Sequence, residues 1–210
     1  MDYSNYERHQ HTDPSFPVIF HYDVVKNPKE YNQVLHWHES IELLYFVQGV
    51  GTVICDLNSV TAKEGDIVII NGNELHSVSA VTQKVEYYCL IIDNAVYEEL
   101  LPSISNNQFF NLVTEDKKAC LIMDSIIEEI GAKGISYQAA VKASIVNLLI
   151  HFTRNYTAPT PSQLKNNKKI NKIKLVKNTL NYMKNNYTKE LSIDELCKYV
   201  GFSKYYFCRT

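Results

Sequence analysis

The chain has 210 residues, 21 basic against 23 acidic side chains and a hydrophobic fraction of 45%, as in an ordinary globular protein. This length allows one sizeable domain and a smaller second one. The sequence has no apolar run long enough to span a membrane and no signal-peptide pattern at its N-terminus. Its five cysteines lack Cys-x-x-Cys spacing, which indicates buried thiols in a reducing compartment. We therefore expect a cytoplasmic protein with no membrane partner.

The net charge of −2 conceals an uneven distribution. Residues 159–210 contain eleven basic and three acidic residues, a charge of +8, and residues 1–158 contain ten and twenty, a charge of −10. A solvated lysine-rich helix surface would account for the basic segment alone. An acidic body with a basic tail also predicts two domains, of which only the second meets a polyanion such as DNA.

Residues 16–92 alternate between short apolar segments and turn sequences. The segments are rich in β-branched and aromatic residues and recur about every ten residues, which is typical of an antiparallel sandwich or barrel. The predicted strands are 16–25, 41–48, 51–57, 66–70 and 85–92.

The spacing of apolar residues becomes helical after residue 112 and predicts two amphipathic helices, the first ending before Gly131. These helices would either cover the barrel or pair with a second copy. Their apolar positions are Cys120, Met123, Ile126, Ile127 and Ile130, then Val141, Ile145, Leu148, Leu149, Phe152 and Tyr156.

A polar segment with two prolines, 158–169, predicts a linker. A third helical stripe follows it, formed by Ile170, Ile173, Val176, Leu180, Met183 and Tyr187.

The segment LSIDELCKYVGFSKYYFCRT predicts two helices joined by a tight turn. Ser192 and Glu195 form a capping-box pattern, with Ile193, Leu196 and Val200 as the buried positions. Gly201 permits a left-handed turn, and Ser203 can cap the second helix. An ordinary helical hairpin is one interpretation. In the other, a helix-turn-helix, Ser203 and Lys204 meet phosphates, and Tyr205 and Arg209 reach base edges beside Cys208.

This segment resembles the first helix-turn-helix of the AraC family of bacterial transcription regulators. The resemblance covers residues 170–210 and includes only one of the family's two such motifs, so we expect an incomplete, all-helical DNA-binding domain. By position, the resemblance assigns base contacts to Tyr205, Cys208 and Arg209.

A histidine-rich stretch, HWHESIE, opens the second predicted strand. His36 and His38 would point the same way on a strand, Glu42 can join them, and His76 follows a later strand and turn. Imidazoles and a carboxylate suit a divalent metal such as Zn, Mn, Fe or Ni.

The same residues resemble the two motifs of the cupin superfamily. His36, His38, Glu42 and Gly49 have the spacing of the first motif, and Gly65 and His76 that of the second. Four motif positions differ from the family pattern: Glu30, Asn71, Asn73 and Ala80.

Together these features predict an α+β protein with the layout of the sugar-sensing AraC branch. The expected parts are an arm (1–15), a jelly-roll-like cupin barrel (16–112), a helical packing or dimerisation segment (113–157), the linker (158–169) and the partial DNA-binding domain (170–210). The resemblance implies a homodimeric, non-enzymatic regulator with a small effector, such as a sugar, which the arm contacts, and no required cofactor.

The expected effector pocket contains His36, Trp37, His38, Glu42, Tyr45, His76 and Tyr88, with core packing an equal alternative for the two tyrosines. We expect His9, His11 and His21 on the surface. A metal-dependent cupin enzyme, a dioxygenase or sugar isomerase, is the alternative function, but it leaves the basic tail unexplained.

Overall fold

The computed structural model of the chain describes residues 6–11, 13–26, 35–56, 58–102, 104, 108–158, 175–176, 178–179, 182–183, 186 and 188–209. The chain forms two compact units, Met1–Ala158 and Pro159–Thr210, which we describe separately. The charge of the sequence changes sign at the same boundary.

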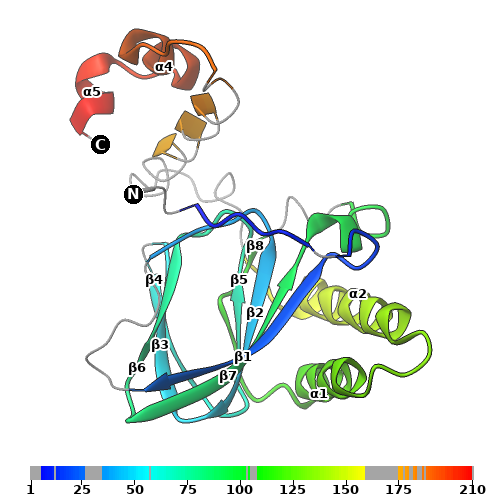
Figure 1. The fold of residues 1–210 in the computed structure, drawn as a ribbon. Coiled ribbons are helices and arrows are strands. Elements are labelled where there is room, and N and C mark those ends of the chain that lie inside the picture. Colours follow the sequence, from blue (N-terminus) through cyan, green and yellow to red (C-terminus); the bar gives the residue numbers. More distant parts are fainter. Residues whose placement is uncertain are drawn as a thin grey trace. The chain divides into compact units, whose positions relative to one another are not determined.

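The first unit contains two facing antiparallel sheets, confirming the predicted barrel (Figure 1). Its strands are β1 (Val18–Lys26), β2 (Ile41–Gln48), β3 (Val50–Cys55), β4 (Asn58–Lys63), β5 (Ile67–Ile70), β6 (His76–Ala80), β7 (Lys84–Ile92), β8 (Gln108–Phe109), β9 (Leu112–Val113) and β10 (Thr157–Ala158). The five-stranded sheet has the order β1-β7-β2-β5-β9, the three-stranded sheet the order β4-β3-β6, and β8 pairs with β10. The sequence predicted neither β4 nor β6, because both are short and polar.

Strand β2 is buried on both faces. Leu44 and Phe46 point into the barrel and join the core between the two sheets. Their neighbours Ile41, Leu43 and Tyr45 point to the other side of the sheet and join a second core. Burial on both faces explains why this strand is almost continuously apolar.

Helices α1 (Lys117–Ala132) and α2 (Tyr137–Asn155) cover that second face. The predicted stripe of α2 is confirmed, since Val141, Ile145, Leu148, Leu149 and Phe152 are all buried. The predicted end of α1 before Gly131 is wrong. The helix continues through Gly131 and ends where Lys133 adopts a left-handed conformation at φ 48°.

The second unit contains α4 (Ile193–Val200) and α5 (Lys204–Arg209), joined by a turn in which Gly201 has φ 74°. The Ser192 hydroxyl accepts a hydrogen bond from Glu195 N (3.1 Å), and that of Ser203 accepts one from Tyr206 N (3.3 Å), so both predicted caps are confirmed. The predicted burial of Ile193 is wrong, because its side chain is 47% exposed and Cys197 is buried beside Leu196 instead.

The expected linker from residue 159 onward and four positions of the third stripe, Ile170, Ile173, Leu180 and Tyr187, lie outside the described residues. The described residues between 175 and 186 are helical. Val176 and Met183 are exposed there, whereas Leu175 and Thr179 are buried. The predicted stripe therefore lies on the wrong face at these two positions. Among the described residues, no helix is both long and apolar enough to cross a membrane.

Asp116 links the two helices of the first unit. Its Oδ1 caps α1 by accepting hydrogen bonds from Lys118 N (3.1 Å) and Ala119 N (3.0 Å). Its Oδ2 accepts hydrogen bonds from His151 Nε2 (2.6 Å) and the Tyr156 hydroxyl (2.8 Å). Burial alone would raise the pKa of Asp116, but these contacts together lower it to about 2.

Replacing Asp116 by alanine should lower the free energy of unfolding by about 1–3 kcal/mol, because a helix cap and two side-chain hydrogen bonds are lost. The folded-state pKa lies below the ordinary value of 3.8. The stabilisation is therefore complete above that value and is lost as the pH falls towards about 2. Urea denaturation at several pH values measures this difference, with the exposed Glu128→Gln on α1 as control. A stability difference that does not shrink at low pH would contradict the assignment.

Candidate metal and effector site

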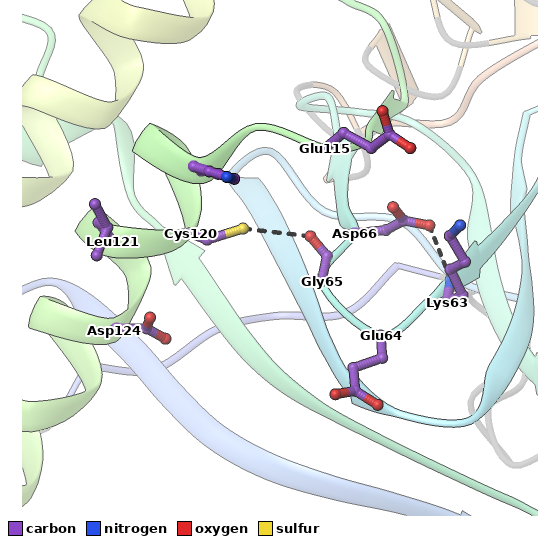
Figure 2. Close-up of a pocket in the computed structure, with 9 residues that line it drawn as sticks. Lys63, Glu64, Gly65, Asp66, Glu115, Cys120, Leu121 and Asp124 are labelled. Carbon is purple, nitrogen blue, oxygen red and sulfur yellow. Dashed lines mark hydrogen bonds between the residues drawn. The ribbon is translucent and has the colours of Figure 1, made fainter.

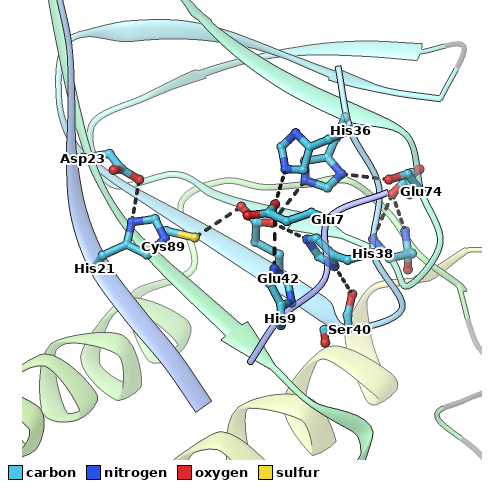
Figure 3. A network of polar contacts seen from close by, with 12 residues as sticks. Glu7, His9, His21, Asp23, His36, His38, Ser40, Glu42, Glu74 and Cys89 are labelled. Carbon is cyan, nitrogen blue, oxygen red and sulfur yellow. Dashed lines mark hydrogen bonds and ion pairs between the residues drawn. The ribbon is translucent and has the colours of Figure 1, made fainter. Parts of the chain in front are cut away.

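Four side chains singled out by their spacing in the sequence lie together at one end of the barrel (Figure 3). His36 and His38 precede β2, Glu42 lies near its start, and His76 is the first residue of β6. The backbones of His36 and His76 exchange hydrogen bonds of 3.0 and 2.8 Å, and their rings lie 4.1 Å apart. One ligand atom from each of the four residues lies within 4.8 Å of the others. We call these four residues the barrel cluster.

Backbone carbonyls fix the tautomer of the two buried imidazoles. His38 Nδ1 lies 3.1 Å from the carbonyl oxygen of Ser40, and His76 Nδ1 lies 2.8 Å from that of Glu74. A carbonyl oxygen only accepts, so each Nδ1 carries a proton and donates it. In the neutral imidazole, Nε2 then has a lone pair. Both Nε2 atoms face Glu42 Oε2, at 2.8 Å from His38 and 3.2 Å from His76.

The charge of Glu42 requires a positive partner. Burial would raise its pKa, but His38 and His76, where a proton lies between their Nε2 atoms and the carboxylate, outweigh burial and hold the pKa of Glu42 well below its usual value. Burial lowers the pKa of His38 and so favours its neutral form, despite the opposing effect of Glu42. A carboxylate facing two imidazole lone pairs is unfavourable without a positive charge between them. The barrel cluster therefore needs either a shared proton or a metal ion.

Cys89 on β7 contacts the other carboxylate oxygen of Glu42. Its thiol donates a hydrogen bond to Oε1 over 3.2 Å. Burial, together with the nearby carboxylate of Glu42, raises the pKa of Cys89 well above its usual value. The thiol thus stays protonated and orients the carboxylate, leaving Oε2 for the imidazoles.

The barrel cluster fits a divalent metal ion. His76 Nε2 is completely buried and makes no well-formed hydrogen bond to the described residues. Glu42 Oε2 lies 3.2 Å from this nitrogen, close enough for one ion to contact both atoms. The Nε2 atoms of His38 and His76 lie 2.8 and 3.2 Å from Glu42 Oε2. Two ligand atoms that each lie about 2.1 Å from the same metal ion are separated by similar distances. Metal-binding histidines usually donate their second N–H to a carbonyl or carboxylate, as His38 and His76 do. A bound ion would supply Lewis acidity toward a ligand with oxygen donors.

The N-terminal arm lies against the barrel cluster. Tyr6 forms a parallel β-bridge with Trp37, and Glu7 N donates a hydrogen bond to the Trp37 carbonyl at 2.9 Å. Glu7 Oε2 lies 3.0 Å from His36 Nε2, and contacts with His36 and then His9 hold the pKa of Glu7 far below its usual value.

The expectation that His9 lies on the surface is wrong. Its side chain is only 9% exposed, and its ring centroid lies 4.5 Å from that of His38. His11 is also largely covered, whereas His21 is 40% exposed. The one available signal for His9 was its spacing of two residues from Glu7, which places both on one face of an extended arm.

The aromatic residues expected in the effector pocket separate into two groups. Trp37 lies beside the barrel cluster, its ring centroid 4.7 Å from that of Tyr6. Tyr45 and Tyr88 point to the helix-covered face of the sheet, away from Glu42. This placement corrects the prediction for both tyrosines and supports the alternative of core packing. Residues an odd number apart on a strand face opposite sides, so Tyr45 cannot share the face of Glu42 on β2.

The residues expected to contact DNA lie on or just before α5. Lys204 Nζ pairs with Asp194 at 3.0 Å, and its side chain is 59% exposed. Tyr205 is 69% exposed. Arg209 lies over the Tyr205 ring at 4.9 Å and donates a hydrogen bond to its hydroxyl. Cys208 is exposed. A basic and aromatic surface is thus present on one short helix.

A surface hollow of about 470 Å³ lies outside the barrel, between the β4–β5 turn and the start of α1 (Figure 2). Lysines and carboxylates line it, and the Cys120 thiol donates a hydrogen bond to Gly65 O at 3.3 Å. None of the expected effector residues contributes to this hollow.

Comparison with known families gives a match over more than half of the chain. The family described as AraC-like ligand binding domain matches residues 27–149, a range that contains the whole barrel cluster. No curated protein matches the sequence at a significant level.

Several solved structures resemble part of the chain. A cupin-family protein with a double-stranded β-helix fold from Methanocaldococcus jannaschii has 18% identity and a TM-score of 0.33, over 36% of this chain and 69% of that one. An HTH_3-family transcriptional regulator from Vibrio cholerae has 15% identity and a TM-score of 0.34, over 38% of this chain and 44% of that one. A predicted oxalate decarboxylase from Thermotoga maritima has 24% identity and a TM-score of 0.33, over 35% of this chain and 64% of that one. The present chain covers less than two thirds of the Vibrio cholerae and Thermotoga maritima proteins.

Replacing Glu42 by glutamine should weaken Ni²⁺ or Zn²⁺ binding at least tenfold, because a ligand charge is lost while the side-chain shape is kept. Isothermal titration calorimetry of the metal-free protein measures the affinity. The exposed Glu64→Gln, in the β4–β5 turn, is the matched control. Equal affinities in the two variants would contradict a metal site at the barrel cluster.

Proposed function

The chain belongs to the family of AraC-like ligand-binding domains, with a cupin double-stranded β-helix followed by helices, and on that premise we propose that it is the sensor of an AraC-type transcription regulator. A domain of this family implies a small-molecule effector and is typical of non-enzymatic regulators. The observation that carries the proposal is the buried barrel cluster, in which two imidazole Nε2 atoms converge on one carboxylate oxygen.

We place the effector at the barrel cluster, beside Trp37. A sugar, or another small metabolite with several hydroxyl groups, matches the donors and acceptors there, and the Trp37 ring offers a flat surface for a sugar face. A divalent metal in the barrel cluster would bind hydroxyl or carboxylate oxygens of the same ligand.

The second unit is the proposed DNA-binding part. Its segment carries a charge of +8, and α5 begins with Lys204 and ends with Arg209. We assign phosphate contacts to Ser203 and Lys204, and base contacts to Tyr205, Cys208 and Arg209. Exposed apolar side chains on and next to α1, Leu121 and Ile135, support a homodimer formed through the helical segment.

The second candidate function is a metal-dependent cupin enzyme, either a dioxygenase or a sugar isomerase. The four-residue ligand set of the barrel cluster favours it. The basic second unit has no role in such an enzyme. Turnover of a sugar or of oxygen by the metal-loaded protein, without DNA binding, would favour the enzyme over the regulator.

An effector should raise the melting temperature, because it binds the folded protein only. A panel of monosaccharides and sugar acids, each tested with and without Ni²⁺, can be screened by thermal shift. Trp37→Ala should reduce the shift of any hit, whereas Phe110→Ala, which removes an exposed aromatic ring of the same unit, should not. Equal loss in both variants would contradict the placement of the effector.

DNA binding should depend on α5. With DNA from upstream of the protein's own gene, Lys204→Ala should weaken binding uniformly and reduce the salt slope by about 1. Arg209→Ala should cost about 1–3 kcal/mol and relax sequence preference. Fluorescence anisotropy between about 50 and 200 mM salt measures both effects. The exposed Lys118→Ala of the first unit is the control. Binding that is insensitive to salt, or equally affected by Lys118→Ala, would contradict the proposal.

A further inference from the structure

The arm carries two potential metal ligands that face the barrel cluster (Figure 3). Arg8 and Gln10 are exposed, whereas the side chains of His9 and His11 are mostly covered. This alternation is that of an extended segment lying on a surface, with its odd-numbered residues turned towards it. His9 therefore belongs to the face of the arm that meets the barrel, and Glu7, although its side chain is 49% exposed, reaches His36 and His9.

Glu7 and His9 come together with His38. Glu7 Oε2 lies 3.7 Å from His9 Nε2, and one ligand atom from each of Glu7, His9 and His38 lies within 4.8 Å of the other two. We call these three residues the arm group. His9 Nε2 is buried and has no hydrogen-bond partner among the described residues. A buried polar nitrogen in this state costs free energy, which a bound cation would recover.

The charges of the arm group also favour a cation. Glu7 of the arm group and Glu42 of the barrel cluster are carboxylates, contributed by the arm and by β2. Two carboxylates neutralise one divalent ion, and the neutral imidazoles add ligands without adding charge.

We propose that Glu7, His9 and His38 form a metal site at which a divalent transition-metal ion ties the arm to the barrel. His38 Nδ1 is engaged by the Ser40 carbonyl, so only Nε2 remains for a metal, and the arm group and the barrel cluster share one ion. This inference rests on the proposed function only in that the same ion lies at the proposed effector site.

Other contacts hold the two ends of the arm without a metal. Tyr6 pairs with Trp37 at one end. At the other end, His11 lies 3.3 Å from Asp93, and Asp13 accepts a hydrogen bond from Gln138 of α2 at 2.9 Å. The ion would fix the part between these ends, directly over the barrel cluster.

Trypsin cleavage after Arg8 reports on this part of the arm, because Arg8 is exposed between the two ligands and cleavage requires the local backbone to open. In the wild-type protein, saturating NiCl₂ or ZnCl₂ should slow this cleavage at least tenfold, as followed by intact mass. Cleavage after Lys133, in the exposed α1–α2 loop, controls for effects of the metal on trypsin itself.

Glu7→Gln and His9→Gln should abolish the protection of Arg8 and weaken metal binding at least tenfold in calorimetry. His11→Gln, on the same arm but outside the arm group, should keep both properties and is the matched control.

Equal metal affinity in wild type, Glu7→Gln and His9→Gln, with no protection of Arg8, would overturn the arm group and leave the barrel cluster standing. Loss of protection in His11→Gln as well would also overturn it, because arm order would then depend on the Asp93 contact. No metal binding to wild type would overturn both metal sites, whereas the effector and DNA experiments would still decide the proposed function.

Discussion

A buried carboxylate that faces two imidazole lone pairs is the interaction on which the site depends. Glu42 is 4% exposed, His38 2% and His76 0%, so water cannot screen them. The Ser40 and Glu74 carbonyls fix both rings in the tautomer that turns Nε2 towards Glu42. Leaving such a charge uncompensated would cost several kcal/mol. The surrounding contacts therefore prepare the barrel cluster to receive a positive charge.

Strand β2 connects this site to the rest of the domain. Glu42 faces the barrel interior, and its immediate neighbours Ile41 and Leu43 face the core beneath α1 and α2. The chemistry and the helix packing thus occupy opposite faces of one strand. Gly49 ends this strand at φ 80°, and a Cβ atom there would lie 2.1 Å from the Lys84 carbonyl oxygen. This backbone contact gives a physical reason for the glycine of the first cupin-like motif.

Local patterns in the sequence predicted much of the fold. The periodicity of α2 identified its buried residues, and the apolar segments located β1, β2, β3, β5 and β7, because these signals depend on neighbours along the chain. Spacing also singled out the four residues of the barrel cluster. Strands β4 and β6 escaped prediction, because their pairing with β3 supplies the order that their own composition does not.

The errors in the site arose from long-range packing. Tyr45 and Tyr88 are predicted in the pocket because they are aromatic, with core packing as an equal alternative because their strands are apolar on both faces. Alternation along such strands could not show which face meets the helices. His9 is predicted on the surface because its spacing from the other histidines gives no signal, and the arm, which pairs with Trp37, brings it to His38. The positions of Tyr45, Tyr88 and His9 therefore cannot be predicted from their neighbours in the sequence.

The barrel cluster holds its Nε2 atoms in position for a cation. Long-range ¹H–¹⁵N NMR of the histidine side chains, with and without Zn²⁺, tests it most directly. We expect the Nδ1–H tautomer for His38 and His76, and a shift of both Nε2 resonances when Zn²⁺ is added. The Nε2–H tautomer, or resonances that do not respond to Zn²⁺, would contradict it.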